Sequence, residues 1–183
     1  MKNSSVEARA AAGFPTGWHS PDTISDTARP AELWPWLVEP GSLTARLRAA
    51  CGDAFRVRVL MSAASEVTAD EAEWFGHPHA FVREVYLCSG GTPWVYARTL
   101  VLDGSPSEAR LRTLGETPLG DGAFGRASTR RESLEVARLD HPMFADALPQ
   151  GVAAVWARRS VLRVDGEPLH IAEYFLDGPT PWT

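Results

Sequence analysis

Residues 158–178 form the sequence RRSVLRVDGEPLHIAEYFLDG. An Asp-Gly pair at 165–166 separates two runs of alternating side chains, which is the strongest short-range signal for a β-hairpin. Because successive side chains on a strand point to opposite faces, Glu173 shares its face with Ile171 and Phe175. The pattern therefore predicts an antiparallel strand pair that carries a carboxylate on an otherwise apolar face.

A second hairpin precedes this one in the chain. FVREVYLC (81–88) and PWVYARTLVL (93–102) flank SGGT, whose glycines adopt a positive φ at little cost. Further alternating segments begin at Phe55 and Ser128. Caps and glycine stops predict four short helices, at 31–38, 42–50, 68–75 and 105–114. We therefore predict an α+β domain, a six-stranded, mostly antiparallel sheet with short helices packed on one face.

Length and composition limit the number of domains and the kinds of partner that the sequence allows. The chain has 183 residues and a net charge of −5, enough for one domain and too short for two comfortable ones. Apolar residues in 1–30 follow no sustained helix or strand periodicity, so we predict a loosely ordered N-terminal segment, the lead-in. One domain then follows over 31–183. The negative charge gives no support to nucleic acid or an anionic membrane as a partner, and the sequence has no membrane-spanning run or secretion signal. We expect a cytoplasmic monomer that binds a small molecule.

Strand alternation places three charged side chains on faces that are otherwise apolar: Arg83, Arg98 and Glu173. Isolated buried charges are costly, so such groups pair with one another or with a ligand. One interpretation is a structural arginine–glutamate pair, or an arginine whose stem lies along the sheet. The other is a pocket for a small cyclic or aromatic carboxylate, because arginine forks bind carboxylates and a carboxyl group in apolar surroundings serves as acid or base.

Other candidates for chemistry are weak. Cys51 and Cys88 are too few for a disulfide scaffold or a zinc ribbon. His77 and His79 flank a proline, with no third ligand at a spacing that suits a metal. Nucleophile-elbow, P-loop and dinucleotide motifs are absent from the sequence. The glycine-rich stretch 116–125 is typical either of a surface loop or of a lid over an active site.

Three segments together resemble the chorismate pyruvate-lyase family: FVREVYLCSGGTPWVYARTLV, LRTLGETPLGDGAF and RRSVLRVDGEPLHIAEYFL, in this order. Members of that family convert chorismate to 4-hydroxybenzoate and pyruvate. The resemblance runs from about Trp34 to Phe175. It implies a six-stranded antiparallel sheet with helices on one side, and an enclosed site that uses neither a metal nor an organic cofactor.

The same resemblance implies roles for the three charged residues. Arg83 in VREVYL resembles the arginine that holds a substrate carboxylate, and Arg98 in ARTLV resembles a second arginine of the site. Glu173 in IAEYFL resembles the glutamate beside the reacting centre. This interpretation requires all three side chains to point into one enclosed chamber.

Uncharged site residues follow from the resemblance as well. Leu119 in TPLG resembles the residue whose backbone meets the ligand beneath a lid, and Gly120 follows it. Leu43 takes, after a shift of one residue, the place where other members have a methionine that contacts the ligand.

Three alternatives remain open from sequence. The same fold serves as the effector-sensing domain of some bacterial transcription regulators, although this chain has no room for their winged-helix domain. The protein could instead be a lyase for a related enolpyruvyl compound, such as an aminated or isomeric chorismate. An inactive pocket that stores an aromatic acid is the third alternative. The sequence also leaves open whether a product would feed quinone synthesis or secondary metabolism.

Overall fold

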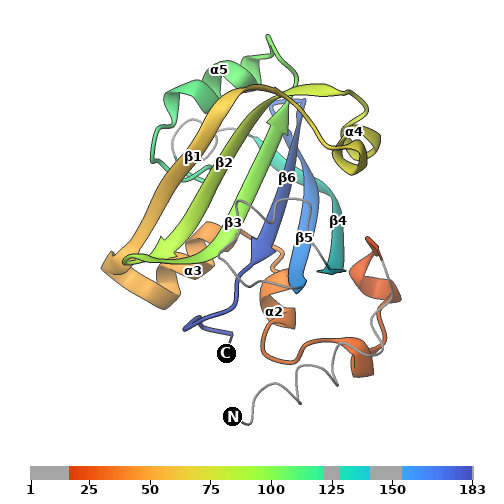
Figure 1. Cartoon of the computed structure of the whole chain (residues 1–183), viewed down its shortest axis with the longest axis vertical. Helices are drawn as coiled ribbons and strands as arrows, with labels where there is room; N and C mark the ends of the chain where they lie inside the picture. The colour runs from red at the N-terminus through yellow and green to blue at the C-terminus, as the bar shows by residue number, and fades with distance from the viewer. Residues whose placement is uncertain (1–16, 122–127, 141–153, 183) are drawn as a thin grey trace.

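The structure is a computed structural model that describes residues 17–121, 128–140 and 154–182. A single six-stranded sheet dominates it (Figure 1), and its strands run in the order β1-β2-β3-β6-β5-β4. Every neighbouring pair of strands is antiparallel. The predicted α+β fold with an antiparallel sheet is confirmed. The strands are β1 (Phe55–Glu66), β2 (His79–Ser89), β3 (Thr92–Val101), β4 (Thr129–Asp140), β5 (Ala154–Val164) and β6 (Glu167–Phe175).

The two predicted hairpins, β2–β3 and β5–β6, form the four inner strands of this sheet, with β1 and β4 at its edges. Asp165 and Gly166 have φ values of 51° and 89°, which is the left-handed backbone that a two-residue hairpin turn requires. They join β5 to β6 between Val164 and Glu167, which pair with each other. The β2–β3 hairpin turns at Gly90, which also has a positive φ, of 58°.

Short helices cover both faces of the sheet. They are α2 (Trp34–Leu37), α3 (Leu43–Cys51), α4 (Ala69–Phe75) and α5 (Pro106–Thr113). Side chains of α2, α3 and α5 pack on the face that carries Phe81 and Val85. In contrast to the predicted single helical layer, α4 packs on the opposite face, against Val82 and Leu100. The reason is that the central strands are apolar on both sides, so each face must be covered to bury it.

Part of the predicted lead-in packs against this body. His19 forms an isolated antiparallel bridge with Val136 of β4, and Ile24 and Ala28 are buried in the main core cluster. His19 makes a single bridge, and Ile24 and Ala28 lie at the ends of short 3-10 turns. Such short features have no long period for sequence analysis to detect. The predictions for residues 1–16, for 122–125 and for the connection 141–151 lie outside the described residues.

Candidate active site

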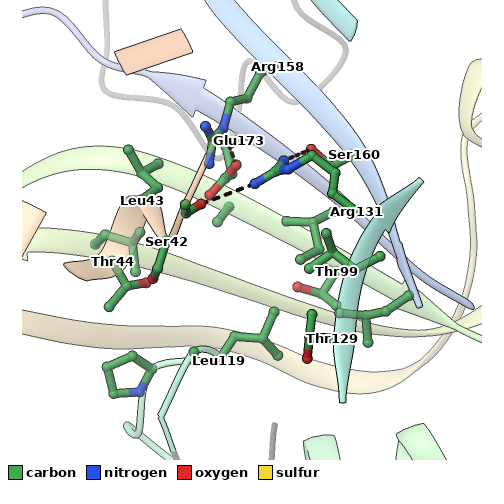
Figure 2. A pocket seen from close by; sticks show the side chains of 18 of the residues that line it. Ser42, Leu43, Thr44, Thr99, Leu119, Thr129, Arg131, Arg158, Ser160 and Glu173 are labelled. Atoms are coloured by element: carbon green, nitrogen blue, oxygen red, sulfur yellow. Dashed lines mark hydrogen bonds and ion pairs between the residues drawn. The ribbon is translucent and has the colours of Figure 1, made fainter. Parts of the chain in front are cut away.

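A cavity of about 440 Å³ lies on the sheet face that carries Arg83 and Glu173. Strands β2, β3, β6, β5 and β4 provide its walls and floor, and residues 40–44 and 118–120 close it from the other side. The volume falls within the usual range of small-molecule sites, roughly 300–1,000 Å³. Figure 2 shows Leu43, Leu119, Thr129 and Glu173 arranged around it. The structure thus brings together five of the six predicted site residues: Leu43, Arg83, Leu119, Gly120 and Glu173.

Arg83 is a buried cation whose partners are neutral. Its side chain is 3% exposed, and its guanidinium donates to the carbonyl oxygens of Gly115 at 2.9 Å and of Thr117 at 3.2 Å. Burial lowers the pKa of Arg83 below its usual value. Among the described residues, no carboxylate forms an ion pair with it. A buried guanidinium that lines a cavity without a counter-ion is suited to bind an anionic ligand.

Glu173 lies in the same cavity and is held by a neighbouring arginine. The Nε atom of Arg158 donates to its carboxylate at 2.5 Å (Figure 2). Arg158 is itself 2% exposed and also donates to the carbonyl oxygens of Trp36 and Glu39, each at 3.3 Å. These contacts anchor the ion pair to the segment around α2. They orient the glutamate toward the cavity and compensate its charge.

Two chain segments approach closely where they close the cavity. The Oγ atom of Ser42 caps α3 by accepting from the amide of Ala45 at 3.2 Å, and Leu43 begins the helix as a buried residue. A Cβ atom on Gly120 would lie 3.2 Å from the Oγ atom of Ser42. Gly120 therefore permits the close approach that places Leu119 at the cavity.

Arg98 is the one predicted site residue that lies elsewhere. Ala97 and Thr99 line the cavity, so Arg98 between them on β3 points to the opposite face. There it is buried beneath α4 and forms ion pairs with Glu71, at 2.5 Å, and with Glu84. The prediction that Arg98 shares a chamber with Arg83 and Glu173 is wrong. Alternation along one strand shows which side chains share a face. Because both faces of β3 are apolar, alternation alone does not show which face lines the cavity.

Arg98→Lys tests this placement. We expect the substitution to lower the free energy of unfolding by about 1–3 kcal/mol, because an ammonium group cannot reproduce the forked contacts with Glu71 and Glu84. Urea unfolding followed by tryptophan fluorescence measures the change. The affinity of the folded variant for a small aromatic carboxylate, the ligand class that the sequence predicts, should equal that of the wild type. A stable variant that loses this affinity would instead place Arg98 in the site.

Two arginines of the cavity were missed from sequence, Arg131 on β4 and Arg158 on β5. Arg158 could have been found, because the two-residue turn at 165–166 sets the register of its hairpin and pairs Arg158 directly with Glu173. No comparable sequence pattern predicts that Arg131 faces the cavity. A bulge in β4 between Arg131 and Ser133 shifts the register with β5 and interrupts the alternation that would assign its face.

Neither metal-binding clusters nor spanning helices occur in the part of the chain that the structure describes. Over residues 17–121, 128–140 and 154–182, no three His, Cys, Asp or Glu side chains gather closely enough to hold a metal ion. Within the same ranges, no helix combines the length and the apolar character needed to cross a membrane.

Comparison with solved structures supports the fold. The C-terminal domain of PhnF superposes with a TM-score of 0.54 over 65% of this chain and 80% of that domain, at 12% sequence identity. At this low identity, the similarity shows a shared fold.

Comparison of sequences places the chain in a family. The chorismate lyase family matches residues 15–183. A probable chorismate pyruvate-lyase of Chromohalobacter salexigens is 40% identical over 148 residues, which cover 79% of this chain and 80% of that protein. A probable chorismate pyruvate-lyase of Shewanella amazonensis is 38% identical over 174 residues, 89% of this chain and 90% of that protein. Since the family match extends over all six strands and every residue that lines the cavity, the chain belongs to the chorismate lyase family.

Proposed function

We propose that this protein is a chorismate pyruvate-lyase that converts chorismate to 4-hydroxybenzoate and pyruvate in the cavity described above. The observation that carries the proposal is the shared cavity of Arg83 and Glu173. Arg83 is a buried cation with no carboxylate partner among the described residues, and Glu173 is an anchored carboxylate. Family membership names the substrate class, and the cavity offers groups that suit its chemistry.

The substrate supplies the driving force of this reaction. Chorismate is a cyclohexadiene that bears a ring carboxylate, a hydroxyl group and an enolpyruvyl ether with a second carboxylate. Cleavage of the ring carbon–oxygen bond of the ether releases enolpyruvate, and loss of the hydrogen on the hydroxyl-bearing carbon makes the ring aromatic. The enolpyruvate gains a proton at its methylene carbon and becomes pyruvate, so all atoms of the substrate appear in the two products. The protein needs to orient the substrate and stabilise the charge that develops as the ether bond breaks.

Each predicted residue that lines the cavity has a role in this scheme. Arg83 holds the ring carboxylate through its guanidinium. Glu173 contacts the hydroxyl group or assists transfer of the neighbouring ring hydrogen. Leu43 and Leu119, with the apolar floor around Ile171, contact the ring and exclude water. Gly120 permits the closed arrangement, and an aromatic product held in it should leave slowly and inhibit turnover.

Direct assay of the products tests the proposed function. Purified protein is incubated with chorismate, and pyruvate and 4-hydroxybenzoate are quantified by chromatography; equimolar formation of both is expected. Isochorismate and aminodeoxychorismate, assayed in parallel, distinguish a lyase for a related enolpyruvyl compound. Unchanged chorismate together with tight binding of 4-hydroxybenzoate would contradict the proposal and favour an effector-sensing or storage role.

A further inference from the structure

The charges that line the cavity do not balance. Its charged lining residues are three arginines and one glutamate: Arg83, Arg131, Arg158 and Glu173. Arg158 is paired with Glu173 and with two backbone carbonyls. Two guanidinium groups, on Arg83 and Arg131, therefore remain without a carboxylate partner among the described residues. A cavity with this excess of positive charge is complementary to a ligand that carries two negative charges.

Arg131 is held in place but its hydrogen-bonding capacity is not filled. Its guanidinium donates to the Oγ atom of Ser160 and to the carbonyl oxygen of Gly41, the latter at 3.2 Å. Its Nε atom is buried and has no hydrogen-bond partner. Both existing acceptors are neutral, and both belong to residues that line the cavity (Figure 2). A buried donor without a partner is costly, which favours a ligand that supplies an acceptor there.

The register of the sheet places the two arginines at opposite sides of the cavity. Arg83 pairs with Thr99, Thr99 with Ile171, and Ile171 with Ser160, which accepts from Arg131. These residues form one row across β2, β3, β6 and β5, and all of them line the cavity. Arg83 and Ser160 are three strand spacings apart, roughly 14 Å between backbones in a flat sheet. Arg83 thus lies at one end of this row, and the contact between Arg131 and Ser160 lies at the other.

We infer that Arg131 forms a second carboxylate site, which binds the carboxylate of the enolpyruvyl group while Arg83 binds that of the ring. The inference rests on the proposed function for the identity of the ligand, and on the row of paired residues and the unmatched charges for its geometry. Arg158 is not this site, because its guanidinium is engaged by Glu173 and the carbonyl oxygens of Trp36 and Glu39.

Matched stable ligands test this inference without turnover. 3-(Carboxymethoxy)benzoate carries a ring carboxylate and a second carboxylate on an ether at the ring position that bears the enolpyruvyl group in chorismate, whereas 3-methoxybenzoate carries only the first. Wild-type protein should bind the dicarboxylate more tightly, as measured by calorimetry. Arg131→Gln should lower the affinity for the dicarboxylate by roughly 10- to 100-fold and change the affinity for the monocarboxylate by less than about twofold. Arg131→Lys should retain part of the preference, since it keeps the charge.

The control is Arg130→Gln, on the adjacent residue of the same strand. The Arg130 side chain is 73% exposed and pairs with Glu132 at 2.9 Å, so this variant should bind both ligands as the wild type does. Thermal melting of each variant establishes that it is folded. If folded Arg131→Gln keeps the full preference for the dicarboxylate, or loses affinity for both ligands equally, the inference is wrong.

The same experiment separates this inference from the proposed function. Wild-type protein that forms no pyruvate from chorismate, yet shows a preference for the dicarboxylate that depends on Arg131, would overturn the lyase and retain the second carboxylate site. Wild-type turnover with an unchanged preference in Arg131→Gln would retain the lyase and overturn the second site. Wild-type protein that forms no pyruvate from chorismate and binds neither ligand would overturn both.

Discussion

Arg83→Gln is expected to reduce kcat/KM for chorismate by roughly 100- to 1,000-fold. The substitution removes the buried positive charge that pairs with the ring carboxylate of the bound substrate. The loss should appear in the affinity for 4-hydroxybenzoate as well, since the product keeps the ring carboxylate. Steady-state assay of pyruvate release and calorimetry with 4-hydroxybenzoate measure the two effects.

Arg83 also donates to the carbonyl oxygens of Gly115 and Thr117, so its substitution could act through the loop that carries Leu119. Arg83→Lys keeps a cation at this position and should recover part of the affinity, while losing the fork geometry. Arg130→Gln again serves as the exposed control. Unchanged affinity for 4-hydroxybenzoate in folded Arg83→Gln would show that the ring carboxylate binds elsewhere.

Glu173→Gln is expected to lower kcat for chorismate by roughly 100- to 10,000-fold, the range associated with loss of a positioned acid or base. The amide keeps the shape of the side chain and an oxygen that accepts from Arg158, so the protein should fold and bind 4-hydroxybenzoate with a much smaller change. Single-turnover measurements of 4-hydroxybenzoate formation separate the chemical step from product release.

A matched control for this variant is Glu135→Gln. Glu135 lies on β4 and pairs with Arg159 at 2.7 Å, outside the residues that line the cavity. It is therefore also a strand glutamate paired with a β5 arginine, and its substitution should leave the rate unchanged. Turnover of chorismate by Glu173→Gln at the wild-type rate would rule out the role assigned to the glutamate.

The arginines that line the cavity are Arg83, Arg131 and Arg158, and Arg98 is not among them. The sequence predicts Arg83, Arg98 and Glu173 in one chamber, whereas Arg98 lies with Glu71 and Glu84 on the far face of the sheet. The geometric support for an anionic substrate now comes from Arg83 together with Arg131. Arg98 instead compensates two carboxylates beneath α4, a role that concerns stability.

Local patterns in the sequence were sufficient for the strands, the hairpins and most helix ends. An Asp-Gly turn has few alternatives to a two-residue hairpin, and its register then pairs Arg158 with Glu173. Caps act over three or four residues, so Thr68 and Ser105 begin their helices as the sequence predicts. Each of these features depends on residues close together in the chain, and sequence contains the information that they need.

The assignment of sheet faces depended on contacts between distant segments. Alternation divides a strand into two sets of side chains, but when both sets are apolar, only the elements packed on each side distinguish cavity from core. The position of α4 buries Arg98, and the bulge in β4 helps direct Arg131 toward Ser160. Local sequence patterns therefore predicted the strands and identified Arg83 and Glu173 as site residues. Packing between distant segments determined which other arginines line the same cavity.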